Sequence, residues 1–147
     1  MGAEPYFYIV KYQPDVGAAL HALRQREFKA GRYNPVTPFL TFPVDEDAPG
    51  PGAGHGSIEE ALEEADADGT RSILDIQAVS DEPGFMVAAP FPPDRLREIF
   101  GTEQPSRAMV EANDDFFEDI ERGHAVYIVL YADGKPDAIL FAGYSFD

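Results

Sequence analysis

The sequence predicts an α+β fold: a single domain over residues 1–147, built on a mainly antiparallel sheet of about five strands with about three or four helices. Three observations lead to this prediction. A length of 147 residues suits one core. Apolar residues make up 44% of the chain and aromatic residues 12%, which is enough for a packed interior. Strand-like segments come in adjacent pairs instead of alternating with helices, which disfavours a doubly wound parallel sheet.

The first elements are a strand and a helix. Residues 6–12 are aromatic and β-branched and lie between two prolines, as is typical of a strand. Asp15 is placed to cap a helix that carries apolar residues on one side and ends near Ala30, before Gly31. A long Pro/Gly-rich loop is expected over 32–56, with Phe39, Leu40 and Phe42 held against the core and a mobile stretch at 49–56.

The second half of the chain offers equally local signals. Ser57 and Glu60 form a capping box that opens a helix ending near Gly69. Strands are expected over 71–79 and 85–88 with a turn between them. Helices are expected over 94–100 and from Thr102 or Ser106 to Arg122, each ended by a glycine. Finally, a C-terminal β-hairpin is expected from two apolar runs, 124–131 and 138–146, that flank Asp133-Gly134.

The net charge and the amino-acid composition argue against several classes of function. The chain has 27 acidic and 11 basic residues, a formal charge of −16, which disfavours direct binding to nucleic acids or to anionic membranes. It has no cysteine, which excludes disulfides, thiol nucleophiles and cysteine-ligated metals. The start of the chain lacks the basic residues and the long apolar run of a secretory signal, so a cytoplasmic location is expected. No cofactor motif and no catalytic motif is recognisable, and an enzyme is the less favoured expectation.

The acidic residues are concentrated in two segments. Nine lie between Asp45 and Asp68, and six lie between Glu111 and Glu121. In the second segment Asp114, Asp115, Glu118 and Asp119 are spaced so that several of them share one face of the expected helix. Such a face can steer and dock a basic partner, although it can also be merely solvated. The sequence therefore favours a binding or regulatory protein, such as an inhibitor, an immunity-type protein or an adaptor, that recognises a basic protein.

A basic cluster supports an alternative function. Four of the 11 basic residues fall within nine positions and are followed by Tyr33; they are Arg24, Arg26, Lys29 and Arg32. In so acidic a chain they could bind an anion through bidentate guanidinium contacts. The alternative is thus a binding protein for a small molecule or an anionic ligand, with room for catalysis, that uses residues 24–33 and the 32–56 loop. Basic residues near a helix end can equally serve only to complement its dipole.

The tyrosines give a third candidate surface. Six of the seven lie in expected strands, and alternation places Tyr6, Tyr8 and Tyr12 on one face. Tyr127 and Tyr131 share a face of their own strand by the same alternation. A face containing Tyr8, Tyr127 and Tyr131 could receive a ligand or a partner if the helices covered the opposite face. The competing interpretation is that both faces of the sheet are packed.

Residues 64–75, which begin inside the helix expected from Ser57, are weakly similar to a calcium-binding loop. Glu64, Asp66, Asp68 and Asp75 fall at ligand spacings, and Gly69 stands at the turn position. Against this, the final ligand is Asp instead of Glu, and a strand is expected where the second helix of such a site should begin. A solvated turn at the end of a helix is the simpler interpretation.

Overall fold

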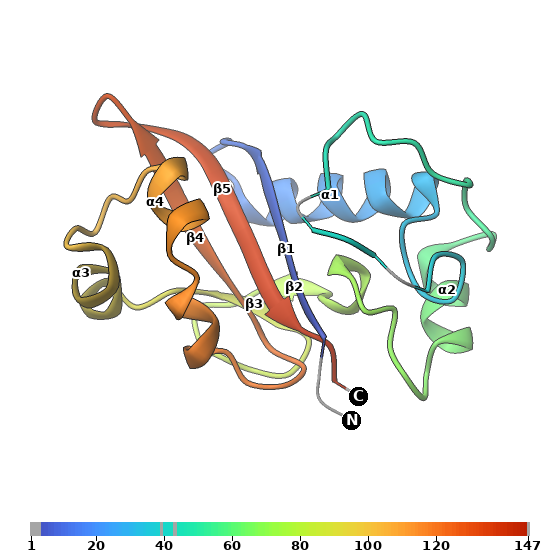
Figure 1. Cartoon of the computed structure of the whole chain (residues 1–147). Coiled ribbons are helices and arrows are strands. Elements are labelled where there is room, and N and C mark those ends of the chain that lie inside the picture. The colour runs from blue at the N-terminus through green and yellow to red at the C-terminus, as the bar shows by residue number, and fades with distance from the viewer. Residues whose placement is uncertain (1–3, 39, 43, 147) are drawn as a thin grey trace.

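The central element of the structure is a five-stranded sheet with strand order β1-β5-β4-β3-β2 (Figure 1). The computed structural model describes residues 4–38, 40–42 and 44–146. The strands are β1 (Pro5–Lys11), β2 (Ala78–Val79), β3 (Val87–Pro90), β4 (Ala125–Ala132) and β5 (Lys135–Tyr144). The helices are α1 (Val16–Ala30), α2 (Ile58–Glu64), α3 (Pro93–Phe100) and α4 (Arg107–Ala112), with two short 3₁₀ helices, η1 (Ile73–Asp75) and η2 (Asp115–Asp119).

The strand directions confirm the α+β prediction and refine it. The long central strand β5 pairs antiparallel with both β1 and β4. The short strands β2 and β3 pair parallel to each other, and β3 pairs parallel to β4. The sheet is therefore mixed, although its longest pairings are antiparallel as expected.

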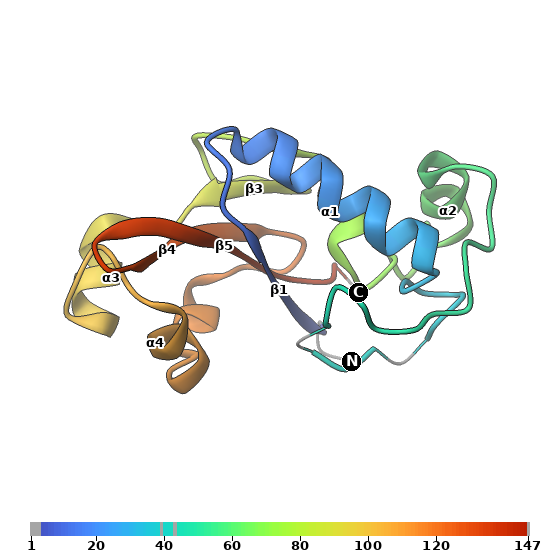
Figure 2. The same ribbon diagram turned by 90° about the horizontal axis from the view of Figure 1, so that it is seen from above.

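Helices lie on both faces of this sheet. Seen from above, α1 lies on one side of the sheet and α3 and α4 lie on the other (Figure 2). Apolar side chains under α1 form one core, which includes Tyr6, Tyr8, Leu20, Leu23 and Phe141. A second core on the opposite face includes Phe91, Val110, Phe116, Ile128 and Leu140. The side chains of each strand contribute alternately to the two cores, because successive side chains in a strand point to opposite faces of the sheet.

The predicted ends of helices and the predicted hairpin turn are confirmed where a capping side chain or a glycine determines them. The Asp15 carboxylate accepts the Ala18 N–H at 3.0 Å, and Gly31 ends α1 in the left-handed conformation with φ 75°. The Ser57 hydroxyl accepts the Glu60 N–H at 3.2 Å. At the hairpin turn Asp133 and Gly134 have φ values of 53° and 76°, as a two-residue turn of this kind requires.

Three predicted elements are wrong in the middle of the chain. Residues 71–79 form no continuous strand, because Ser72 caps the 3₁₀ helix η1 and only Ala78–Val79 pair. The next strand runs over 87–90 instead of 85–88 and is parallel to β2, so the two form no hairpin. The helix expected to end near Gly69 ends at Glu64.

The 32–56 loop is anchored rather than free. The Gly52 N–H donates to the Ala30 carbonyl at 2.9 Å, which ties the glycine-rich stretch to the end of α1. The Phe42 ring lies 5.2 Å from the Tyr8 ring, as the expected core contact requires. Phe39 lies outside the described residues. Within the stretch 49–56 that is expected to be mobile, the Gly54 N–H donates to the Tyr33 hydroxyl at 3.1 Å and the Gly56 N–H donates to the Glu60 carboxylate at 2.7 Å.

Candidate functional site

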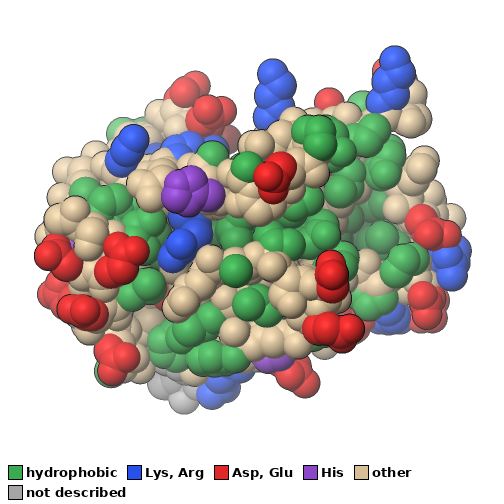
Figure 3. Space-filling view, turned by 180° about the vertical axis from the view of Figure 1, so that it is seen from behind, with side chains coloured by type: hydrophobic (Ala, Val, Ile, Leu, Met, Phe, Trp, Pro, Cys, Tyr) green, Lys and Arg blue, Asp and Glu red, His purple; other side chains and the backbone are tan. Residues whose placement is uncertain are grey.

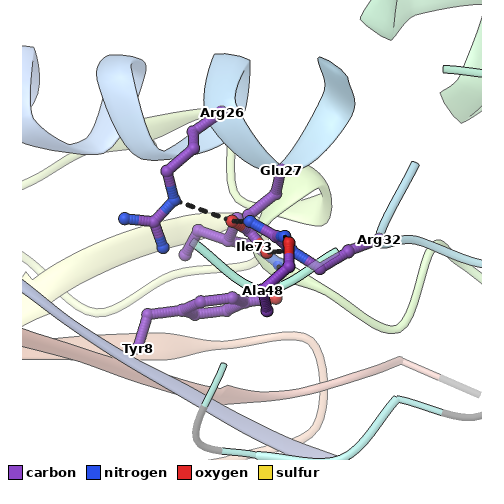
Figure 4. Close-up of polar contacts among 6 residues, drawn as sticks. All are labelled: Tyr8, Arg26, Glu27, Arg32, Ala48 and Ile73. Carbon is purple, nitrogen blue, oxygen red and sulfur yellow. Dashed lines mark hydrogen bonds and ion pairs between the residues drawn. The ribbon is translucent and has the colours of Figure 1, made fainter. Parts of the chain in front are cut away.

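Two members of the basic cluster serve an internal ion pair. Glu27 on α1 is fully buried and lies between Arg26 and Arg32 (Figure 4). Arg32 donates from Nε to Oε1 at 2.8 Å and from Nη2 to Oε2 at 2.6 Å, while Arg26 Nε donates to Oε2 at 2.8 Å. Arg32 Nη1 also donates to the carbonyl of Ala48. The hydrogen bonds to Glu27 raise the pKa of Arg32, and this residue acts as a clamp between α1 and the loop.

Arg24 and the neighbouring Tyr33 also have internal partners, whereas Lys29 is exposed. Arg24 Nη2 donates to the Leu74 carbonyl at 2.9 Å, and burial lowers the pKa of its guanidinium. Tyr33 is fully buried, and its ring stacks on Phe28 with centroids 5.8 Å apart. The structure therefore does not bring Arg24, Arg26, Arg32 and Tyr33 together in one open anion site.

A hydrogen-bonded chain of Tyr33, His55 and Glu64 was not foreseen from the sequence. The Tyr33 hydroxyl lies 2.7 Å from His55 Nδ1, and the other ring nitrogen contacts the Glu64 carboxylate. The Gly54 N–H donates to the same hydroxyl at 3.1 Å. Because the Tyr33 side chain has no exposed surface, a substrate could not reach the hydroxyl. These contacts instead fasten the loop between α1 and α2.

The calcium-like residues do not converge. Glu64 contacts His55, and Asp66 and Asp68 are exposed. Asp75 is buried, and its Oδ1 accepts both the N–H and the hydroxyl of Thr70 at 2.8 Å. Across the described part of the chain, no group of three or more His, Asp or Glu side chains is placed to hold a metal ion.

The tyrosine face is mostly packed. Tyr6 and Tyr8 are fully buried under α1, and the Tyr8 hydroxyl accepts the Ile73 N–H at 3.3 Å. Tyr127 and Tyr131 are half-buried, and burial together with the charge of Asp81 raises the pKa of Tyr127. Seen from behind, this side of the molecule has a shallow hollow with hydrophobic side chains (Figure 3). Since helices lie on both sheet faces, the packed interpretation of the tyrosines holds for Tyr6 and Tyr8.

The acidic segment 111–121 does not form one helix. Helix α4 ends at Ala112, and Asn113 has an extended backbone with φ −142° and ψ 108°. Its side chain accepts the Asp115 N–H at 3.0 Å and donates to the Ile99 carbonyl at 3.4 Å. Asn is prone to such local bonds, which compete with the helix. Asp114, Asp115 and Glu118 are exposed as expected. Asp115 and Glu118 lie one turn apart in the short 3₁₀ helix η2, and Asp114 precedes it, so they belong to no continuous helix with Glu111.

This break places a carboxylate at the edge of an apolar cleft. The cleft has a volume of about 290 Å³. Its apolar lining consists of Phe7 and Ile9 from β1, Leu140 from β5, Val110 from α4, and Phe116 and Phe117 from η2. Glu111 and Asp114 complete the lining. We call this site the acid-rimmed cleft.

The floor of the acid-rimmed cleft belongs to the sheet. Phe7 and Ile9 are half-buried and alternate with Tyr6 and Tyr8, which face α1. The Phe7 ring meets the Phe117 ring edge-on, with centroids 6.4 Å apart. In Figure 1, α4 and the segment after it lie beside β5 and in front of β4, and no helix of the described part of the chain lies in front of β1. Apolar side chains at this edge of the sheet thus stay accessible.

A more polar cleft of about 360 Å³ lies near the end of β1. It is lined by three basic residues, Lys11, Arg26 and Arg107, and by three acidic residues, Asp45, Glu46 and Asp137. The opposite charges balance, so this cleft offers no net attraction for an anion. In the acid-rimmed cleft, by contrast, both charged lining residues are acidic and the other lining residues are apolar.

Comparisons with known proteins assign neither a family nor a function to the chain. No family model, no curated protein and no solved structure matches the chain. Within the residues that the structure describes, no helix is both long enough and apolar enough to span a membrane.

Proposed function

We propose that the protein binds a basic protein partner and that the acid-rimmed cleft is the docking site. The observation that carries the proposal is the combination of an apolar cleft of about 290 Å³ with two carboxylates in its lining. An apolar side chain of the partner would fill the cleft, and Lys or Arg residues beside it would meet Glu111 and Asp114. The protein would act as an inhibitor, an immunity-type protein or an adaptor.

The energetic roles of the two parts differ. Full burial of a Leu, Phe or Met side chain from the partner contributes about 1.5–3 kcal/mol. The carboxylates are exposed, so they contribute mainly to the association rate and to the choice of partner. The net charge of −16 adds long-range attraction for any cationic protein.

The rim carboxylates are available for such a partner. Asp114 makes no ion pair with any base in residues 4–38, 40–42 and 44–146. Glu111 lies 3.6 Å from Arg107, and both side chains are about half exposed, so this pair is weak. A partner cation could therefore replace Arg107 at little cost.

Selection from a random peptide display library tests the proposal. The enriched sequences should carry an apolar residue flanked by Lys or Arg. They should bind at least about tenfold more weakly to the double variant Glu111→Gln/Asp114→Asn, which corresponds to about 1.4 kcal/mol.

A matched variant controls for net charge. Glu63→Gln/Asp66→Asn removes the same two charges from exposed positions of residues 58–68. It should leave the affinity of the selected peptides within about twofold of the wild-type value. Enrichment of acidic or uncharged peptides, or equal losses in the two double variants, would contradict the proposal.

A further inference from the structure

We propose that the segment of the partner that enters the acid-rimmed cleft is an amphipathic α-helix with a basic flank. The inference rests on the proposed function, and it adds the conformation and the charge pattern of the ligand.

The first argument is the incomplete helical layer on this face of the sheet. Val110 and Phe116 pack with Ile128, Leu130 and Leu140, so α4 and η2 cover β4 and β5. Phe7 and Ile9 on β1 belong to the same apolar core but remain half-buried. A sheet face is normally buried under helices, and one helix covers a width of about 10 Å. One more helix beside α4 would complete the layer.

The second argument excludes addition of a strand at β1. Although β1 is an edge strand, residues 40–42 and 44–46 flank it. The Phe42 ring lies 6.3 Å from the Phe7 ring and 5.2 Å from the Tyr8 ring. Val44 and Glu46 line a cleft together with Val10 and Lys11 at the other end of the strand. An added strand would have to displace this segment, whereas a helix on the open face would not.

The third argument is the distribution of charge around the cleft. A helix docked in an apolar groove uses anchors spaced at i, i+3 or i+4, and i+7. The apolar lining comes from β1, β5, α4 and η2, while Glu111 and Asp114 lie on the α4 side only. The helix should therefore carry its Lys and Arg residues along the flank that faces α4. Asp115 and Glu118 are exposed in the following 3₁₀ helix η2 and extend this acidic side.

Three peptides of identical composition test the inference. Each has about 15 residues, near the length at which isolated helices become marginally stable. The first places Leu at helical spacing with Lys on one flank. The second has the same residues in scrambled order, and the third keeps the first pattern but contains two D-amino acids that break the helix. Affinity is measured by isothermal titration, helix content by circular dichroism, and the binding site by amide chemical-shift changes in the labelled full-length protein.

The helical peptide should bind at least about tenfold more tightly than the other two, gain helix content on binding, and shift the amides of Ile9, Val110 and Phe117. Equal affinity of all three peptides for the cleft would overturn the helix inference while leaving the basic-partner proposal intact. If none of the three peptides bound, the helix inference would also be overturned. The proposed function would then be tested separately by the selection from the peptide display library.

Variants of the protein add a control that depends on surface charge alone. Asp114→Lys places a cation at the rim on an exposed position and should weaken binding of the helical peptide by more than about tenfold. Glu63→Lys makes the same charge change on α2 and should weaken it by less than about threefold. Similar effects of the two variants would show that the cleft is not the site.

Discussion

At the scale of single residues, the buried Glu27 is expected to contribute strongly to stability. Its carboxylate is fully buried and satisfies Arg26 and Arg32, which join α1 to the 32–56 loop. Glu27→Gln would keep the shape of the side chain and leave the buried Arg32 guanidinium without its counter-charge. We expect a loss of about 3–5 kcal/mol in the free energy of unfolding, measured by urea denaturation.

A matched variant separates this effect from a change in net charge. Glu63→Gln removes the same charge from an exposed position and should alter the free energy of unfolding by no more than about 0.5 kcal/mol. Equal changes in the two variants would show that the ion pair adds nothing specific.

The hydroxyls of Tyr6 and Tyr8 predict a loss of stability at alkaline pH. Burial raises the pKa of both groups well above the usual value of about 10. The unfolded chain releases these protons near pH 10 and the folded chain retains them, so rising pH favours unfolding. Above about pH 10 the free energy of unfolding should fall by about 1.4 kcal/mol per pH unit for each tyrosine.

Urea denaturation at several alkaline pH values measures this slope. The Tyr6 hydroxyl is buried and has no hydrogen-bond partner among the described residues. Tyr6→Phe should therefore remove its share of the slope without lowering stability at neutral pH. An unchanged slope in this variant would show that Tyr6 ionises as freely in the folded chain as in the unfolded chain.

At the scale of elements, two helix ends allow a matched comparison. Gly31 and Gly101 both follow a helix in the left-handed conformation, with φ values of 75° and 77°. A Cβ at position 101 would meet no atom within 4 Å, whereas one at position 31 would lie 2.2 Å from the Gly52 carbonyl oxygen. Gly101→Ala should cost about 1 kcal/mol from backbone strain alone. Gly31→Ala should cost clearly more in thermal denaturation, because it also pushes the loop away from α1. Equal costs would show that the loop yields freely.

Elements marked by a capping residue or a turn pair could be predicted from the sequence, whereas a segment whose side-chain bonds oppose its strand-like composition could not. Asp15, Gly31 and the Asp133-Gly134 pair act on neighbouring residues, so their effect is visible in the chain itself. Residues 71–79 have the composition of a strand, but the cap at Ser72 and the bonds from Thr70 to Asp75 bend the segment.

The candidate site was predictable only in part. The acidic character of 111–121 and the alternation of Phe7 and Ile9 are visible in the sequence. The cleft requires these segments to meet across about a hundred residues, and no local pattern shows that β1 lies at the edge of the sheet. The side chain of Asn113 ends α4, and helical spacing alone could not reveal this break.

At the scale of the whole molecule, charge should act in opposite directions on folding and on binding. The free chain carries −16, so added sodium chloride should screen its self-repulsion and raise its melting temperature. The same salt should weaken the affinity of a basic peptide for the acid-rimmed cleft. Thermal denaturation and isothermal titration over one salt series test both effects. An affinity that does not depend on salt would contradict the role of the carboxylates.

Chemical-shift mapping of a library-selected basic peptide on the full-length protein tests the central claim most directly. The proposed function predicts that the largest amide shifts fall on the residues of the acid-rimmed cleft, above all Ile9, Val110, Asp114 and Phe117. Shifts concentrated in 24–33 or in 45–68, with the cleft unchanged, would contradict it.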